Sequence, residues 1–429
     1  MKTLVSRLPI TFSYAKGREW GKLIAITGGA QALVQLSSVI GGILVIRLLS
    51  THEYALYTLA NTMLGTMVML ADNGISNGVM AEAGKVWQNQ AQLGAVLATG
   101  LHLRKKFALY TLLVTIPILG YLLWQHQAVW YAILLIVLAI IPAFAASLSD
   151  TLLEVAPKLH QDINPLQRNQ LEVNAGRLLL NAMLLFVFPF TFVALLANSI
   201  PRIYGNYKLR KLSARYVHTD TVISTAVERE VLKGVKRTLP VVIYHCVSGQ
   251  ISIWLISLFG TTNSIAQIGA LGRLTMAFTL FSSIFSTLAV PRFSRMHNNK
   301  TSLLKGFISI QIIALIIGCV ISIIVWLFSD KILLILGKKY SNLNYELVLV
   351  SIISCVGLLE GLCSQLVLSR GWFFNPYALI IVNFASTIVF ILFSPAFSIA
   401  NILYYNMFTG IIFYLLGLVL GLVKINQIR

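Results

Sequence analysis

The chain alternates between long apolar stretches and short polar connections over almost its whole length. A helix needs roughly 20 apolar residues to cross a bilayer core about 30 Å thick. Stretches that meet or approach this length predict an all-α integral membrane protein with about 12 transmembrane helices. They are residues 23–49, 54–81, 106–124, 128–149, 168–188, 190–206, 239–259, 264–290, 306–329, 344–369, 374–393 and 398–423.

A polar segment, residues 201–240, interrupts this pattern near the middle of the chain. It carries nine Lys or Arg residues against three acidic ones. A loop of this length between two apolar halves is typical of a linker between membrane lobes. The sequence therefore predicts a six-helix N-terminal lobe (residues 1–205), a basic cytoplasmic loop (residues 206–238) and a six-helix C-terminal lobe (residues 239–429).

Composition supports a membrane protein and changes how the charge is interpreted. Hydrophobic residues make up 57% of the chain and charged residues 11%, with a mean hydropathy of +0.81 and a net charge of +19. In a soluble protein that charge would indicate a nucleic-acid partner, which we do not expect here. With the N-terminus inside, one side of the membrane holds 27 of the 33 Lys and Arg residues and the other holds three. Because basic residues collect in cytoplasmic loops, both termini are predicted to be cytoplasmic.

The four cysteines, Cys246, Cys319, Cys355 and Cys363, all lie in apolar stretches. None forms a Cys-x-x-Cys pair, and no His/Cys cluster has the spacing of a metal site. We therefore expect no disulfide framework, no metal and no cofactor.

Polar residues inside the apolar stretches indicate where the helices meet water or one another. Three helices carry them at spacings that place them on one face. Such stripes favour a shared aqueous cavity; hydrogen bonds between helices in a dry bundle are the alternative. The stripes are Gln31, Gln35, Ser38 and Gly42; Asn61, Gly65, Asp72 and Ser76; and Gln170, Asn174, Arg177 and Asn181.

Single charges in the apolar stretches also favour an aqueous cavity. Arg177 and Arg273 are costly in lipid and should face water or an anion, although Arg273 could instead extend to the outer interface. Asp72 and Glu360 are candidates for coupling-ion sites or for hydrogen-bond partners between helices. Arg47 is predicted to be an interfacial anchor.

Four motifs resemble those of one family. RLLSTHEYALYTLA (47–60) is similar to the first outer turn, and LADNGISNGV (70–79) to the end of the second helix, of the polysaccharide-transport (Wzx-type) flippases. LAVPRFSRM (288–296) and LLILGKKYSN (333–342) resemble two segments of the second half of the same family. Ala55 stands where that family usually has Gly. The family belongs to the multidrug/oligosaccharidyl-lipid/polysaccharide exporter (MOP) superfamily, which includes the MATE transporters.

The resemblance implies a V-shaped, MATE-like bundle of two lobes that alternates between inward-open and outward-open states. It implies a flippase in the bacterial inner membrane, not an enzyme. The substrate would be an undecaprenyl-diphosphate-linked oligosaccharide, the repeat unit of an O-antigen, capsule or exopolysaccharide. Partners would be a polymerase and a chain-length regulator of the same pathway.

The residues proposed to contact this substrate follow from the polar stripes and the buried charges. Arginine and amide side chains can hydrogen-bond a diphosphate and sugar hydroxyls. The predicted cavity residues are Arg177, Arg273, Asn174, Asn181, Gln31, Gln35 and Asn61.

Two other functions remain open from the sequence. A multidrug antiporter of the same superfamily is favoured if Asp72 and Glu360 converge on one pocket. A polysaccharide polymerase or ligase is the second alternative. The short outer loops argue against it, because they leave little sequence for a catalytic domain.

Overall fold

The computed structural model describes residues 14–160, 162–218, 223–233, 235–236, 253–258, 260–294, 296, 299–370, 372, 376–393 and 399–427. Most of the predicted helix at 239–259 and the side chain of Gln31 lie outside this description. The helices of the N-terminal half are α1 (Tyr14–Leu48), α2 (Thr51–Asp72), α3 (Ile75–Val86), α4 (Gln90–Gln125), α5 (Trp130–Leu153), α6 (Val155–Leu159), α7 (Ile163–Val187) and α8 (Thr191–Ser213).

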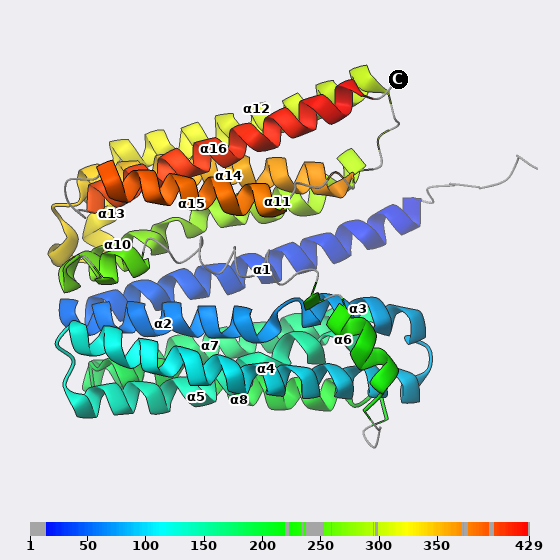
Figure 1. Cartoon of the computed structure of the whole chain (residues 1–429), viewed down its shortest axis with the longest axis horizontal. Coiled ribbons are helices and arrows are strands. Elements are labelled where there is room, and N and C mark those ends of the chain that lie inside the picture. Colours follow the sequence, from blue (N-terminus) through cyan, green and yellow to red (C-terminus); the bar gives the residue numbers. More distant parts are fainter. Residues whose placement is uncertain are drawn as a thin grey trace, which may run out of the picture.

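The helices of the C-terminal half form a second bundle beside the first (Figure 1). They are α10 (Thr262–Leu274), α11 (Met276–Ser294), α12 (Lys300–Leu327), α13 (Ser329–Leu336), α14 (Asn344–Ser369), α15 (Pro376–Phe393) and α16 (Ile399–Asn426), with a 3-10 turn at Lys338–Tyr340. In the first bundle α8 packs on α5 and α7, and α2 packs on α4. In the second, α14 packs on α12 and α16. Helix α10 packs on α2 and so joins the two bundles.

Among the described residues, six helical segments are long and apolar enough to cross a membrane: Thr51–Asp72, Gln90–Gln125, Trp130–Leu159, Lys300–Leu327, Asn344–Ser369 and Ile399–Asn426. The pair α10 and α11, bent by 45°, would make a seventh. Helices α7 and α8 have 25 and 23 residues, enough for a bilayer core at 1.5 Å per residue, but they carry more polar residues. The all-α membrane fold predicted from the apolar pattern is confirmed.

The outer faces of the bundles expose large apolar side chains. Leu113 on α4 is 65% exposed, Trp130 on α5 75% and Leu392 on α15 74%. In water such surfaces would be an aggregation hazard, whereas in a bilayer they face lipid tails. These faces therefore mark where the membrane surrounds the protein.

Two predicted continuous helices are broken in the structure. The predicted helix 54–81 is divided at Asn73 and Gly74, which have φ angles of 40° and 79°. Asn and Gly are the residues that best tolerate this left-handed conformation, so α2 stops and α3 begins in a new direction. The predicted helix 264–290 bends beyond Leu274, where α10 ends and α11 begins.

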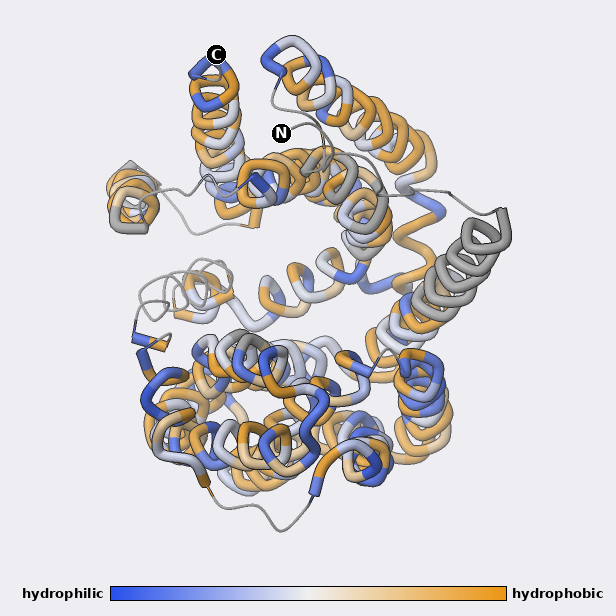
Figure 2. The backbone as a smooth tube through the Cα atoms, turned by 90° about the vertical axis from the view of Figure 1, so that its right-hand side faces the viewer, coloured by the Kyte–Doolittle hydropathy of each residue, from blue (hydrophilic) through white to orange (hydrophobic). Residues whose placement is uncertain are grey.

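The two ends of the bundle differ in chemistry. One end, which we call the basic end, carries α3 and α6 (Figure 1). Lys85 lies in the last turn of α3, Lys158 in α6, Arg168 in the first turns of α7 and Lys208 in the last turns of α8. Figure 2 views this end and shows hydrophilic positions gathered over the N-terminal bundle. Helix α8 continues to Ser213, so the first basic residues of the central segment belong to a helix. The opposite end is the α13 end.

The topology predicted from charge can be tested with single cysteines in a background where Cys246, Cys319, Cys355 and Cys363 are replaced by Ser. Ser341→Cys lies exposed at the α13 end and should react with an impermeant maleimide in right-side-out vesicles. Ala214→Cys lies exposed at the basic end and should react only after the vesicles are opened, because basic segments resist translocation. Neighbouring Ser213 is 2% exposed and would not report on topology. The opposite labelling pattern would reverse the topology.

Candidate functional site: a cationic cavity

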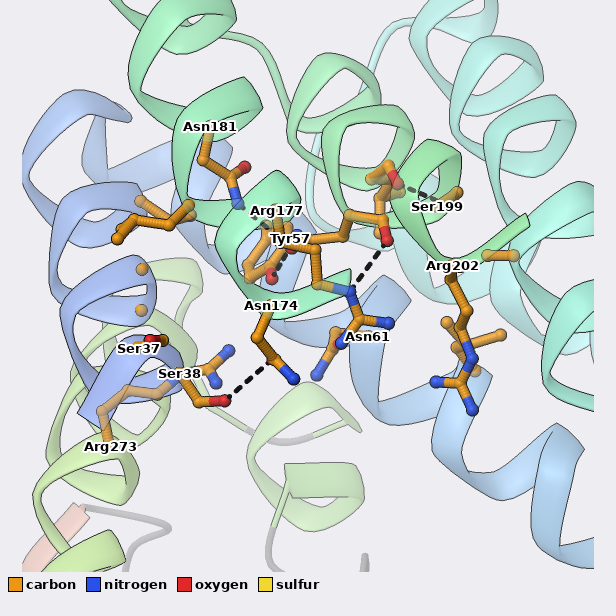
Figure 3. Close-up of a pocket in the computed structure, with 18 of the residues that line it drawn as sticks. Ser37, Ser38, Tyr57, Asn61, Asn174, Arg177, Asn181, Ser199, Arg202 and Arg273 are labelled. Atoms are coloured by element: carbon orange, nitrogen blue, oxygen red, sulfur yellow. Dashed lines mark hydrogen bonds between the residues drawn. The ribbon is translucent and has the colours of Figure 1, made fainter. Parts of the chain in front are cut away.

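A cavity of about 180 Å³ lies inside the N-terminal bundle, where α10 of the second half reaches it. Residues of α1, α2, α5, α7, α8 and α10 line it, and most of them are polar or small (Figure 3). Three arginines line this cavity, and the described residues around it include no Asp or Glu. We call it the cationic cavity. Its polar lining is Ser37, Ser38, Tyr57, Asn61, Ser147, Asn174, Arg177, Asn181, Asn198, Ser199, Arg202 and Arg273.

The structure brings most of the predicted cavity residues together. Asn61 of α2, Arg273 of α10 and three residues of α7 (Asn174, Arg177 and Asn181) all line the cationic cavity. Arg177 and Arg273, which come from opposite halves of the sequence, therefore lie at the same cavity. Figure 3 shows the α7 side chains on one face of that helix.

The remaining predicted residues lie elsewhere. The Gln35 amide donates to the Thr279 hydroxyl at 2.9 Å, between α1 and α11. Glu360 accepts a long hydrogen bond of 3.5 Å from Ser364 one turn further along α14. Neither Gln35, Asp72 nor Glu360 is among the described residues that line the cationic cavity. Asp72 and Glu360 thus do not converge on it.

Arg177 is held in place by Asn198 of α8. Its Nε donates to the Asn198 backbone carbonyl at 3.1 Å, and the Asn181 amide donates to the Asn198 side-chain oxygen at 3.1 Å. The Asn198 amide in turn donates to the Tyr57 hydroxyl at 3.2 Å. Only one guanidinium nitrogen is used in this way, and no described carboxylate forms an ion pair with Arg177. The remaining guanidinium nitrogens can serve a ligand.

Arg273 lies in the last turn of α10, where unpaired helix carbonyls favour a cation. The Tyr54 and Tyr57 hydroxyls lie beside its guanidinium. Gly42 of α1 makes room for it: a Cβ there would lie only 3.1 Å from Arg273 Cδ. Within the described residues it has no carboxylate ion-pair partner. The side chain is therefore positioned without being neutralised.

Arg202 is a cavity residue that the sequence analysis placed in the polar central segment. Its Nε donates to Asp150 at 2.8 Å, and the other Asp150 oxygen accepts from the Asn206 amide at 2.7 Å. A signal was present: Asn198, Arg202 and Asn206 repeat every four residues and so share one face of α8. Arg202 lies where the predicted helix 190–206 overlaps the polar segment 201–240, and its charge was assigned to that segment.

Asp72 is engaged by a buried arginine instead of facing the cavity. Arg104 of α4 is 3% exposed and contacts Asp72, the Ser76 hydroxyl and the Leu148 carbonyl. This ion pair links α2, α4 and α5 at the basic end of the N-terminal bundle.

A second chamber of about 340 Å³ adjoins the cationic cavity toward the basic end. The two share Asn174, Arg177 and Arg202 in their walls. We call it the mouth chamber. Its other lining residues are Asp150, Thr151, Glu154, Asn169, Gln170, Val173, Gly205, Asn206 and Leu209.

At the α13 end the two halves are bridged by hydrogen bonds. Arg47 donates to the carbonyls of Leu334 and Ile335, both at 2.7 Å, and Lys339 donates to the Leu49 carbonyl at 2.9 Å. The predicted interfacial anchor Arg47 thus binds the last turn of α13, where carbonyls lack helical partners.

His126 forms further hydrogen bonds between the two halves. Its Nε2 lies 2.8 Å from the Ser257 carbonyl and its Nδ1 lies 3.1 Å from the Thr262 hydroxyl. Burial lowers the pKa of His126, so the ring is neutral. Because a carbonyl only accepts, Nε2 donates to Ser257 and Nδ1 accepts from Thr262. Hydrogen bonds therefore join the two halves at the α13 end, whereas the cavity continues through the mouth chamber toward the basic end.

No metal site is apparent in the described part of the chain: no group of three or more His, Cys, Asp or Glu residues is placed to hold an ion. The chemistry available at the cavity is binding by guanidinium, amide and hydroxyl groups.

Known proteins resemble the chain at the level of the fold. No protein-family model and no curated protein matches its sequence. A multidrug resistance MATE family transporter of the MOP superfamily, in an inward-facing conformation, superposes with a TM-score of 0.71 at 13% identity. The alignment covers 92% of this chain and 96% of that one. The chain has the fold of the MATE transporters.

Two further structures refine the comparison. An outward-facing multidrug resistance MATE family transporter gives a TM-score of 0.65 at 13% identity, covering 93% of each chain. A MOP superfamily transporter from Pyrococcus furiosus, described as having a binding pocket of reverse polarity that suggests a different function, gives the same values.

The role of Asp72 can be tested by stability. Asp72→Ala should cost about 3 kcal/mol, because it leaves the Arg104 guanidinium buried without a counterion. Replacing both residues with apolar ones should recover part of that loss. Thermal unfolding of the purified protein in detergent measures both effects.

The control is Glu82→Ala, which removes only the surface pair with Lys85 and should cost less than about 1 kcal/mol. If Asp72→Ala were as stable as the parent protein but transport lost its dependence on an ion gradient, Asp72 would be a coupling residue.

Proposed function

We propose that this chain is a membrane transporter that moves an anionic, lipid-linked head group through the cationic cavity by alternating access. The observation that carries the proposal is the lining of that cavity by Arg177, Arg202 and Arg273 without a described carboxylate. The substrate that fits is an undecaprenyl-diphosphate-linked oligosaccharide, a repeat unit of O-antigen, capsule or exopolysaccharide. The protein would then be a flippase and not an enzyme.

The electrostatic argument rests on which cations are already paired. Arg202 is bound to Asp150, so it adds little free charge. Arg177 and Arg273 have no such partner among the described residues. Removing a guanidinium from water is costly, and a ligand phosphate compensates through short, bidentate, charge-assisted hydrogen bonds. Arginine from both halves would let the head group bridge the two lobes.

The conformation supports alternating access. Hydrogen bonds close the α13 end, and the mouth chamber extends the cavity toward the basic end. The TM-score is higher against the inward-facing than against the outward-facing transporter, 0.71 versus 0.65. If the basic end is cytoplasmic, as the charge bias favours, this state is open to the side where lipid-linked sugars are assembled.

The location and partners follow from this assignment. The protein would lie in the bacterial inner membrane with both termini in the cytoplasm. Its product at the outer face would pass to a polymerase and a chain-length regulator of the same pathway.

A multidrug antiporter is the second candidate. It is favoured by the structural neighbours, which are described as multidrug resistance transporters. Identity of 13% shows the fold alone, however, and similar folds host different substrates. A cationic drug would meet like charges in this cavity. Asp72, the acidic residue of α2, is already bound to Arg104. The lining therefore favours an anion.

Replacement of either unpaired arginine tests the function. Arg177→Ala and Arg273→Ala should each reduce flipping at least about tenfold, because each removes a charge-assisted bond of about 1.5–3 kcal/mol. Arg→Lys should restore it partly, since Lys keeps the charge but not the bidentate geometry. The measurement is accumulation of lipid-linked repeat units on the cytoplasmic face of a deletion strain carrying each variant.

Arg215→Ala serves as the control, because Arg215 is exposed outside the cavity and should leave flipping unchanged. Full complementation by both Ala variants at native abundance would make the cavity role wrong. Restored efflux of cationic dyes without any effect on lipid-linked sugars would favour the antiporter.

A further inference from the structure

The mouth chamber differs in chemistry from the cationic cavity that it joins. We infer that it is a second subsite, which binds the neutral, hydroxyl-rich sugar next to the diphosphate while the cationic cavity binds the diphosphate. This inference rests on the proposed function and adds to it the class of sugar and the direction in which the head group lies.

Continuity between the two spaces is the first step. Asn174, Arg177 and Arg202 line both, so a ligand in one touches the wall of the other. The larger space, about 340 Å³ against 180 Å³, lies nearer the basic end. A head group with its phosphates at Arg177 would therefore extend its sugar into the mouth chamber.

The lining of the mouth chamber suits hydroxyl groups, which both donate and accept hydrogen bonds. It offers the amides of Asn169, Gln170 and Asn206 and the carboxylates of Asp150 and Glu154. Amides supply a donor and an acceptor each, and carboxylates supply acceptors. Such a mixture fits a sugar better than a phosphate, which can only accept.

Asn169 is an independent observation that points to a ligand. It is 8% exposed, and its amide nitrogen donates to the Gly205 carbonyl at 3.2 Å. Its side-chain oxygen has no hydrogen-bond partner among the described residues. A buried acceptor without a donor is costly, and a ligand hydroxyl would supply one after a small shift of the side chain.

Charge separates the two subsites. In the mouth chamber Asp150 is paired with Arg202 at 2.8 Å and Glu154 with Lys158 at 2.7 Å. These pairs leave no unpaired cation among the described residues that line the mouth chamber away from the shared wall, so a sugar acid there would lack a counterion. The unpaired positive charge lies at Arg177, on the wall that the two spaces share, and at Arg273, which lines the cationic cavity alone. The sugar next to the diphosphate is therefore neutral, and it lies on the basic-end side.

Two probes in lipid nanodiscs test this assignment: a polyprenyl diphosphate, and the same lipid carrying one neutral hexose. The parent protein should bind the hexosyl probe about fivefold more tightly than the bare probe, as one or two added hydrogen bonds would give. Gln170→Ala should reduce this ratio to about one without changing affinity for the bare probe. Gln170 is half-buried, and its side chain bonds no described residue, so the variant should fold.

Further variants distinguish the sugar subsite from the proposed diphosphate site. Gln167→Ala, one turn earlier on α7 and outside both linings, should keep the fivefold ratio. Arg273→Ala should weaken both probes by the same factor. Asn169→Leu, checked for folding by its thermal unfolding, should act like Gln170→Ala.

The outcomes that overturn the inference are distinct. Equal affinity of the parent protein for both probes, or tighter binding of a hexuronic-acid probe than of the hexose, would make the sugar subsite wrong and leave the flippase proposal intact. Absence of saturable binding of either lipid would overturn the proposed function and the subsite with it.

Discussion

The cost of holding a guanidinium group inside an apolar bundle determines much of this structure. A buried charge must find a counterion, backbone carbonyls or water. Arg104 and Arg202 have carboxylates, and Arg47 has the carbonyls that end α13. Arg177 and Arg273 have no described carboxylate, and both line one cavity. The arginines bound to carboxylates or to the end of α13 hold helices together. The two without a described carboxylate line the proposed site.

The same constraint explains why the two ends of the molecule behave differently. At the α13 end, side chains of one half donate to backbone carbonyls of the other, so each bond disappears if the lobes separate. At the basic end, the ion pairs of α7 and α8 lie within the N-terminal bundle. Opening the basic end therefore breaks none of these pairs, whereas opening the α13 end breaks several hydrogen bonds together.

The sequence was sufficient for the membrane fold and for part of the site. Apolar length predicts helices because a bilayer leaves the backbone no other partner. The spacing of Asn174, Arg177 and Asn181 places them on one face of α7, where the structure has them. Arg273 was predicted to line the cavity because a charged side chain in an apolar stretch is costly in lipid.

Other features depend on contacts that a single sequence does not encode locally. From the sequence alone, Asp72 was a candidate coupling residue. The structure places Arg104, 32 positions further along the chain, beside it. Arg202 lies where the predicted helix 190–206 overlaps the basic central segment. The packing of α8 on α5 and α7 places its side chain at a cavity. Polar faces also lower the hydropathy of α7 and α8, so the helices that build the site give the weakest membrane signal.

Shared architecture with multidrug transporters does not decide what this cavity carries. The backbone arrangement depends on apolar helix contacts, which many sequences satisfy, and it persists here at 13% identity. The charge of the cavity depends instead on a few side chains of α7, α8 and α10. Glutamate at both unpaired positions would reverse the preferred ligand charge, whereas the helix packing depends on other side chains. For this protein the lining of the cavity is therefore stronger evidence for the substrate than the fold that surrounds it.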